Sequence, residues 1–284
     1  MLKHRLDAHL HLQTIPWISC TGDTSGRDTI DSFILKGGKF ICNGTSPLDW
    51  DLVTALAKLY PEELVPFYGV HPWYVDALPE NWLENLQSHL AGDGRGIGEI
   101  GLDKASSHKV SFDLQKEVFK IQLQLAVSMK LPISLHCVRA WESLLKILEE
   151  TVFFSTGSSS TCKVPVMIHS FSGSMEIMKY LTDFGVFLSF SSYLMTEKAE
   201  KLNTVFKAVP LKNILIESDF SFNKNNSFNF QIIDYTGKLE SLYHRAASLK
   251  NMDSLKFQEA VYINGKVFTN RASDWQRKHG YSAE

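Results

Sequence analysis

Short apolar segments alternate with longer amphipathic segments along most of this 284-residue chain. Eight of the apolar segments have the length and the β-branched or aromatic content of strands. They cover residues 5–12, 39–47, 63–73, 94–103, 131–139, 164–173, 185–191 and 213–220. Parallel strands need long crossover connections, which are usually helices. The alternation therefore predicts one α/β domain over residues 1–284, a single (β/α)8 TIM barrel.

Helices are predicted between and after these strands, at residues 29–36, 49–60, 79–91, 111–130, 140–152, 174–184, 196–209, 236–250 and 253–270. Two polar stretches, 154–163 and 221–231, are predicted to be surface loops because they are rich in Ser, Thr, Gly or Asn. An open doubly wound sheet is the alternative. It requires a Gly-rich phosphate loop after the first strand, and residues 8–14 (AHLHLQT) do not form one.

The composition limits the possible partners. A net charge of −2 gives no broad basic surface for coating duplex DNA, so a nucleic-acid substrate has to be held locally, for instance by metal ions. The cysteines Cys20, Cys42, Cys137 and Cys162 form no CxxC pair, which favours a reducing compartment. No signal peptide and no membrane-length apolar run is apparent. We expect a cytoplasmic or nuclear monomer that does not enter a membrane.

Histidines and carboxylates gather at the ends of the predicted strands. Five of the ten histidines and four carboxylates lie there: His9, His11, His71, Glu99, Asp103, His136, His169, Glu217 and Asp219. In a barrel these carboxyl ends meet on one face, where active sites form. Imidazoles and carboxylates without thiolates suit a hydrolytic site for Mg²⁺, Mn²⁺ or Zn²⁺. There are enough side chains for two ions, which a shared carboxylate would hold about 3.5–4 Å apart.

Six ordered motifs together resemble one known family. DAHLHL (7–12), GVHPW (69–73), GEIGLD (98–103), LHCVRA (135–140), MIHSFSG (167–173) and IESDF (216–220) are similar to the signatures of the TatD family of metal-dependent hydrolases, within the amidohydrolase-like barrels. The resemblance implies that one divalent ion is held by His9, His11, Glu99 and Asp219. It implies that a second is held by Glu99, His136 and His169.

The family resemblance also implies an activity. Members are typically deoxyribonucleases, so we expect phosphodiester cleavage at DNA ends, as in a 3'-5' exodeoxyribonuclease. Some members are deacylases of aminoacyl-tRNA, which leaves a metal-dependent ester or amide hydrolase, such as a D-aminoacyl-tRNA deacylase, as an alternative.

Three positions depart from the family pattern: Lys104 replaces an aromatic residue, Val138 displaces Arg139 by one position, and Phe220-Ser221 lacks the usual proline. Phe220-Ser221 and the Asn-rich stretch 221–231 motivate a third possibility, a weakly active barrel that binds a protein partner.

The remaining roles follow from chemistry and position. Asp219 and Glu99 are the predicted catalytic residues, and Asp219 is the better general base, because a carboxylate beside the metals can take a proton from the attacking water. His71 and Arg139 are predicted to contact substrate phosphate, with loop bracing and a surface ion pair as the alternatives. Asp103 and Glu217 are predicted to orient ligands rather than bind metal, with a polar network in the barrel core as the alternative for Glu217. Trp73 and Tyr74 are equally compatible with stacking on a base and with plain packing.

Overall fold

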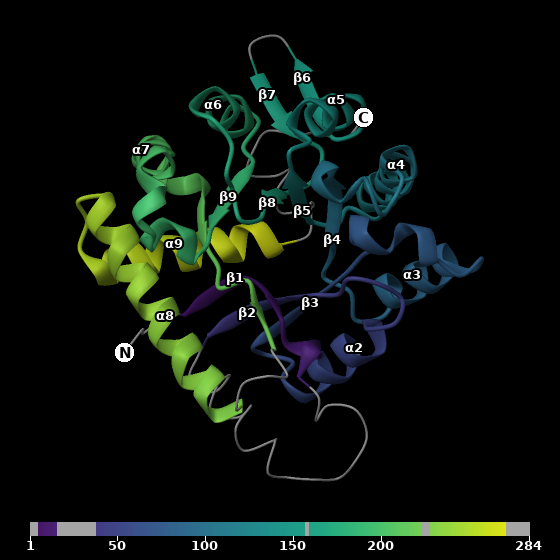
Figure 1. Ribbon diagram of the computed structural model, residues 1–284, viewed down its shortest axis with the longest axis horizontal. Coiled ribbons are helices and arrows are strands. Elements are labelled where there is room, and N and C mark those ends of the chain that lie inside the picture. The colour runs from purple at the N-terminus through teal and green to yellow at the C-terminus, as the bar shows by residue number, and fades with distance from the viewer. Residues whose placement is uncertain (1–4, 16–37, 157–158, 223–227, 271–284) are drawn as a thin grey trace.

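A curled sheet of nine parallel strands forms the centre of the computed structural model, which describes residues 5–15, 38–156, 159–222 and 228–270 (Figure 1). Eight strands fall inside the eight predicted segments and confirm the barrel: β1 (Leu6–His11), β2 (Lys39–Asn43), β3 (Leu64–Tyr68), β4 (Gly96–Asp103), β5 (Ile133–Val138), β8 (Val166–Ile168), β9 (Phe187–Phe190) and β10 (Ile214–Ile216). The ninth, β11 (Phe220–Ser221), directly follows β10 and pairs with β1. The first strand therefore lies beside the end of the last repeat.

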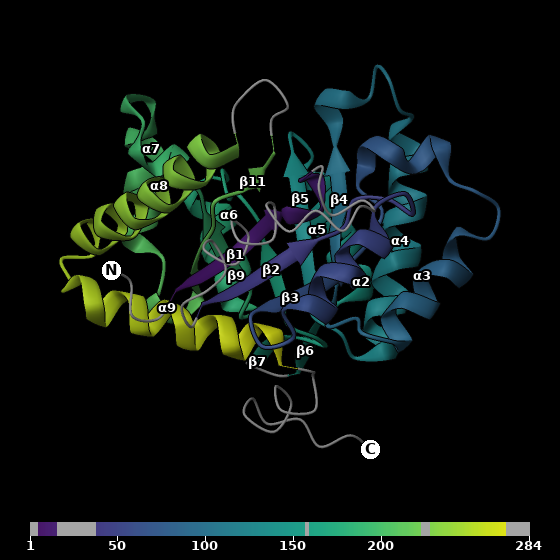
Figure 2. The same cartoon turned by 90° about the horizontal axis from the view of Figure 1, so that it is seen from below.

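Helices surround this sheet in both views (Figures 1 and 2). They are α2 (Trp50–Leu59), α3 (Trp82–Ala91), α4 (Phe112–Met129), α5 (Trp141–Thr151), α6 (Met175–Asp183), α7 (Glu200–Ala208), α8 (Phe228–Leu249) and α9 (Ser254–Thr269). The remaining helical segments are short 3-10 helices: η1 (Leu12–Thr14), η3 (Pro72–Ala77), η4 (Lys104–Ser106), η5 (Ser192–Met195), η6 (Glu197–Ala199) and η7 (Leu211–Asn213). Apolar side chains of strands and helices form one continuous buried core. None of the described helices combines the length and the apolar character needed to cross a membrane.

The prediction of a loop at residues 154–163 was wrong. This stretch contributes most of an antiparallel hairpin, β6 (Phe153–Thr156) and β7 (Ser159–Cys162). The pair at the base of the hairpin is buried: Phe153 stacks on Phe184 with 4.2 Å between ring centroids, and Cys162 is 1% exposed. Packing of these two ends stabilises pairing in a sequence whose composition is typical of a turn.

The polar loop predicted at 221–231 ends earlier than expected. Helix α8 begins at Phe228, eight residues before the predicted start at 236. The helix start carries Asn, β-branched residues and a glycine, which have low helix propensity. Tertiary contacts override that propensity, because Tyr235 and Leu239 on this part of the helix are buried against the barrel. The predicted helix at 29–36 and the thiol of Cys20 lie outside the described residues.

Non-glycine residues with left-handed backbone conformation mark the carboxyl ends of three strands. Arg139 follows β5 with φ 53°, Ser170 follows β8 with φ 42°, and Asp219 follows β10 with φ 53°. Such conformations cost free energy in L-residues and cluster at functional sites. Arg139 and Asp219 are themselves predicted site residues, and Ser170 directly follows the predicted ligand His169.

Candidate metal centre

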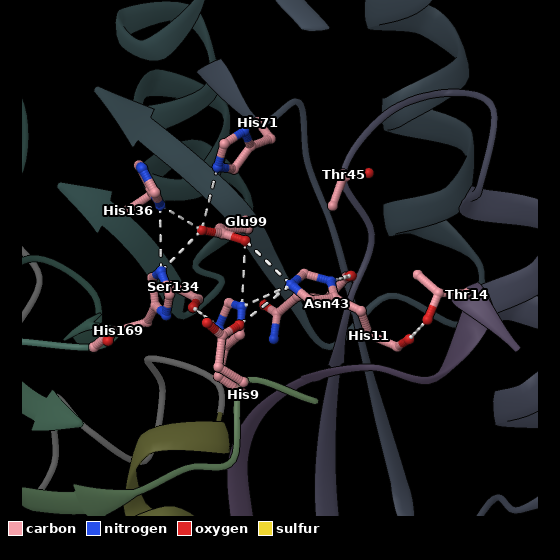
Figure 3. Close-up of polar contacts among 12 residues, drawn as sticks. His9, His11, Thr14, Asn43, Thr45, His71, Glu99, Ser134, His136 and His169 are labelled. Carbon is pink, nitrogen blue, oxygen red and sulfur yellow. Dashed lines mark hydrogen bonds and ion pairs between the residues drawn. The ribbon is translucent and has the colours of Figure 1, made fainter. Parts of the chain in front are cut away.

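Five imidazoles surround one buried carboxylate at the carboxyl ends of the strands. Glu99, from β4, has a side chain only 4% exposed and lies at the centre of the group (Figure 3). The imidazoles come from β1, from the ends of β3 and β8, and from β5: His9, His11, His71, His136 and His169. The structure thus brings together on one face the residues that the sequence placed at separate strand ends.

One oxygen of Glu99 faces the two histidines of the first strand. Its Oε2 lies 3.3 Å from Nε2 of His9 and 3.4 Å from Nε2 of His11. The two Nε2 atoms are 3.2 Å apart, because alternate residues of a strand point to the same side. Asp219 joins this group, with Oδ1 3.8 Å from Nε2 of His11. These donors could hold one ion.

The other oxygen of Glu99 faces the remaining three histidines. Its Oε1 lies 2.8 Å from Nδ1 of His136, 3.0 Å from Nε2 of His169 and 3.4 Å from Nε2 of His71. The ring nitrogens of His136 and His169 that face it are 3.3 Å apart. Glu99 therefore presents one oxygen to each of two donor groups. The sequence predicted His71 as a substrate contact, and the structure places it inside the second group.

Neighbouring groups hold the histidine rings of the first strand in position. Nδ1 of His9 lies 3.2 Å from the hydroxyl of Ser134, and Nδ1 of His11 lies 2.8 Å from the backbone carbonyl of Asn43. A ring whose Nδ1 donates to an acceptor leaves its Nε2 lone pair free for a metal ion. Both Nε2 atoms point at Glu99, so the orientation of the rings matches that of ligands.

The charges of this centre are strongly coupled. Burial alone raises the pKa of Glu99, but the neighbouring His169, His71 and His9 outweigh burial and hold its pKa well below the usual range. Burial lowers the pKa of His169, but the carboxylates of Glu99 and Glu217 raise its pKa well above the usual range. The pKa of His9 is lowered by burial and by the charge of His169. Glu99 is therefore ionised, and cations are favoured around it.

The residues fit a divalent metal. All the donors are nitrogen or oxygen, and three groups of three side chains have their candidate ligand atoms within 4.8 Å of one another. In the described part of the chain, Nε2 of His136 is buried without a hydrogen-bond partner, and its nearest carboxylate oxygen, Oδ2 of Asp103, is 3.5 Å away. Buried polar atoms of this kind are expected to have partners. A cation between the donors would remove the repulsion of closely spaced imidazoles.

Asp219 differs from the other candidate ligands in its exposure. Its side chain is 45% exposed, whereas those of His9 and Glu99 are 0% and 4% exposed. The turn that carries it is fixed by the first strand: the amide of Asp219 donates to the carbonyl of His9 (3.0 Å), and the amide of Ser218 donates to Oδ1 of Asp7 (2.9 Å). Asp219 thus lies at the boundary between the buried centre and solvent.

Two predicted orienting residues contact the histidines. Oδ2 of Asp103 accepts a hydrogen bond from Nε1 of Trp73 (2.6 Å) and faces Nε2 of His136. Oε1 of Glu217 lies 3.3 Å from Nδ1 of His169 and accepts a hydrogen bond from the amide of Ser170 (2.7 Å). Both carboxylates are therefore placed to hold a ring, as an orienting residue should.

Arg139, by contrast, is not gathered into the donor group. It is exposed and makes no hydrogen bond or ion pair with any other described residue.

Trp73 is half exposed, but its ring is edge-on to His71 and its indole nitrogen donates a hydrogen bond to Asp103. Packing and this hydrogen bond therefore account for the position of Trp73. The sequence alone was equally compatible with packing and with stacking on a base.

Sequence reasoning missed Ser134, the carbonyl of Asn43, and the pair Asp7 and Tyr235. Ser134 lies two residues before His136 on β5, so the period of a strand places both side chains on the inner face. Asp7 is two residues before His9, and burial raises its pKa to about 7. Tyr235 donates to Asp7 from helix α8 at 2.8 Å, a contact for which the sequence carries no local signal.

The fold and the donor set define a barrel hydrolase that depends on metal. Comparison with known proteins agrees: the family model described as "TatD related DNase" matches residues 6–269. This chain belongs to the TatD family of metal-dependent hydrolases.

Individual relatives show the extent of the similarity. The chain is 24% identical over 273 residues to an uncharacterized metal-dependent hydrolase of Haemophilus influenzae, covering 94% of this chain and 97% of the relative. It is 30% identical over 163 residues to the deoxyribonuclease Tat-D of Schizosaccharomyces pombe, covering 53% and 49%. The crystal structure of YJJV, a TatD homologue from Escherichia coli, has the same fold, with a TM-score of 0.73, 22% identity, and coverage of 95% of this chain and 98% of that one.

Proposed function

We propose that this chain is a nuclease that hydrolyses phosphodiester bonds at DNA ends with two divalent metal ions. The central support is the carboxylate of Glu99, which turns Oε2 toward His9 and His11 and Oε1 toward His136 and His169. A carboxylate shared between two donor groups is the arrangement of two-metal phosphoester hydrolases. Membership of a family described by its DNases and similarity to a deoxyribonuclease support DNA as the substrate.

Each candidate ligand has a place in this proposal. His9, His11, Glu99 and Asp219 would hold the first ion, and Glu99, His136 and His169 would hold the second. Bound divalent ions, which can be Mg²⁺, Mn²⁺ or Zn²⁺, would neutralise phosphate charge and make water more acidic. Ser134, Asn43, Glu217 and Asp103 would hold the imidazoles in the ligating orientation.

Asp219 would take the proton from the attacking water. It is the exposed carboxylate of the group, so solvent can remove the proton after each turnover. Glu99 cannot do this, since its pKa is well below the usual range and its side chain is buried. Arg139, without an ion pair in the described part of the chain, would be available to contact a substrate phosphate beyond β5, and His71 would bind phosphate or support the second ion.

We further propose that residues 1–284 form one domain that acts as a monomer in the cytoplasm or nucleus. The three described cysteines are free thiols, as expected in a reducing compartment. Sedimentation of the purified chain would test the oligomeric state.

The activity is tested with single-stranded DNA labelled at one end or at the other, in the presence of Mg²⁺, Mn²⁺ or Zn²⁺. We expect stepwise release of nucleotides from the 3' end and complete loss of release with a chelator. An RNA strand of the same sequence and a D-aminoacyl-tRNA serve as competing substrates. Turnover of the aminoacyl ester without release of any nucleotide would replace the nuclease with a deacylase.

A further inference from the structure

We propose that a cavity beside the second donor group binds the base of the nucleotide that is released. The cavity has a volume of about 370 Å³ and is lined by His136, Cys137, Val138, His169, Ser170, Phe171, Ser172, Ser191, Tyr193, Leu202 and Asp219. This inference rests on the proposed nuclease function, because it assigns a substrate group to a position next to the proposed ions. The volume is in the range of small-molecule sites.

The cavity is continuous with the candidate metal centre. Three of its lining residues, His136, His169 and Asp219, are candidate ligands. A phosphate held at the centre therefore places the rest of its nucleotide within reach of the cavity. The other lining residues come from the carboxyl ends of β5 and β8, the segment after β9, and helix α7.

The chemistry of the walls favours a flat, uncharged group. Apart from the candidate ligands, the lining residues carry no charged side chain. Phe171 and Leu202 supply apolar surface, and Ser170, Ser172 and Ser191 supply hydroxyls that can donate or accept at a ring edge. A sugar phosphate would find no cation here, whereas a nucleobase has apolar faces and polar edges that match both kinds of wall.

Tyr193 supplies the stacking surface. It lies on η5 at the rim of the cavity and is 47% exposed. Within the described part of the chain its ring packs on no other aromatic ring and its hydroxyl makes no hydrogen bond. Trp73, whose ring centroid lies 6.4 Å from that of His136, is already bound to Asp103. An exposed aromatic face next to a phosphate site is the usual element of single-strand recognition, and it tolerates any base.

A second cavity, next to the first, is unsuited to a base. It is lined by Glu217, Asp219, Asp234, Tyr235 and Lys238, among others, and has a volume of about 270 Å³. Three carboxylates and one ammonium group would have to be desolvated around a neutral ring, which costs free energy. Asp219 borders both cavities, so the two are neighbours.

The kinetic test compares strands that end in a normal nucleotide with strands that end in an abasic residue. Tyr193→Ala should raise KM for the normal end by about 5- to 150-fold, the range produced by removing a base-stacking aromatic residue. It should leave kcat within about threefold, because the stacked base is not part of the reacting group. It should not change KM for the abasic end, and Tyr193→Phe should behave as the unaltered protein does.

Two further variants distinguish an effect of the cavity itself from an effect of neighbouring residues. Ser172→Trp places an indole in the cavity from an exposed position and should reproduce the loss on normal ends. Met195→Ala changes a neighbour of Tyr193 on η5 that is 43% exposed and does not line the cavity, so it should have no effect. Equal effects of Tyr193→Ala on normal and abasic ends would overturn the proposal.

A binding measurement keeps the proposal testable even without nuclease activity. Calorimetry compares thymidine 5'-monophosphate with deoxyribose 5-phosphate on the intact protein with Mg²⁺. We expect tighter binding of the nucleotide, and we expect Tyr193→Ala to remove this difference. Failure to release nucleotides from DNA would refute the nuclease function alone, whereas equal affinity for the two ligands would refute the base-binding cavity alone.

Discussion

The phenol of Tyr235 donates a 2.8 Å hydrogen bond to Oδ2 of Asp7, joining helix α8 to the first strand across 228 positions of the sequence. Oδ1 of the same carboxylate accepts from the amides of Ser218 (2.9 Å) and His9 (3.3 Å). Asp7 therefore ties together a metal-binding strand, the turn before Asp219 and a distant helix. Asp7, His9 and Tyr235 are buried, and Ser218 is half-buried.

Tyr235→Phe should lower the free energy of unfolding by about 1–3 kcal/mol, because it leaves one oxygen of a buried carboxyl group without a donor. Urea denaturation of the metal-free protein measures the change. Tyr243→Phe is the matched control on the same helix, since its hydroxyl donates to the backbone carbonyl of Leu6 at 2.8 Å. A neutral acceptor makes a weaker bond than an ionised one, so the two variants are compared above about pH 8, where Asp7, with its pKa of about 7, is ionised. A larger cost for Tyr243→Phe than for Tyr235→Phe would contradict this assignment.

Gly101→Ala should destabilise the barrel and disturb His136. Gly101 has φ +149°, and an added Cβ would lie 2.0 Å from the backbone carbonyl oxygen of His136. Strands β4 and β5, which pair at Gly101 and His136, would have to move apart, at a cost of several kcal/mol at this buried position. Gly237→Ala is the opposite control, because its Cβ would meet nothing within 4 Å on an exposed helix position. It should stabilise the protein by about 0.5–1 kcal/mol, and thermal melts of the two variants should shift in opposite directions.

Metal counting by atomic spectroscopy tests the division of ligands. Glu99→Ala should weaken both ions, because each oxygen of this carboxylate faces one donor group. His136→Ala should weaken mainly the second ion, because its ring contacts Oε1 of Glu99, the oxygen that faces the second donor group. Full metal content in Glu99→Ala would show that the shared role is wrongly assigned.

Asp219→Asn should slow the chemical step by about 10²- to 10⁴-fold, the usual contribution of a general base. It keeps the shape of the side chain, so metal loss should be smaller than in Glu99→Ala. Asp234→Asn is the control: this carboxylate lines a cavity with Asp219 and pairs with Lys238 at 2.6 Å. Single-turnover rates on labelled DNA should distinguish them, and an undiminished rate in Asp219→Asn would remove it from proton transfer.

The buried thiols should resist alkylation in the folded protein. Burial raises the pKa of Cys42 and of Cys137 to about 12, and it raises the pKa of Cys162 still further above the usual range. Thiolate is the reactive form, so roughly one thiol in ten thousand is reactive at pH 8. Reaction with iodoacetamide should accelerate about tenfold for each pH unit between 8 and 10. Mass spectrometry of the Cys20→Ser variant measures the labelling of each thiol, in the folded protein and in guanidinium. Rapid labelling of Cys137 in the folded protein would contradict the prediction, because it would show that reagent reaches this thiol.

Much of the fold and of the donor group was predictable, because both depend on local patterns. The apolar strands carry their own signal, and a barrel brings their polar ends together whatever the helices do. The contacts of Asp7 with Tyr235 and of His9 with Ser134 were not predictable, since each joins segments far apart in the sequence. The hairpin at Phe153 and the early start of α8 were missed for a related reason. Their stability comes from burial against distant residues, and their own composition favours other structures.

The pairing of β1 with β11 has a consequence for biosynthesis. His9 and His11 leave the ribosome about two hundred residues before Asp219, which is carried on the turn between β10 and β11. At about 5–20 residues per second, translation separates these events by roughly 10–40 s. Throughout that interval the nascent first strand lacks its last neighbour, and Asp7 lacks both Ser218 and Tyr235. The four candidate ligands of the first ion can come together only after Asp219 has been synthesised and has left the ribosome.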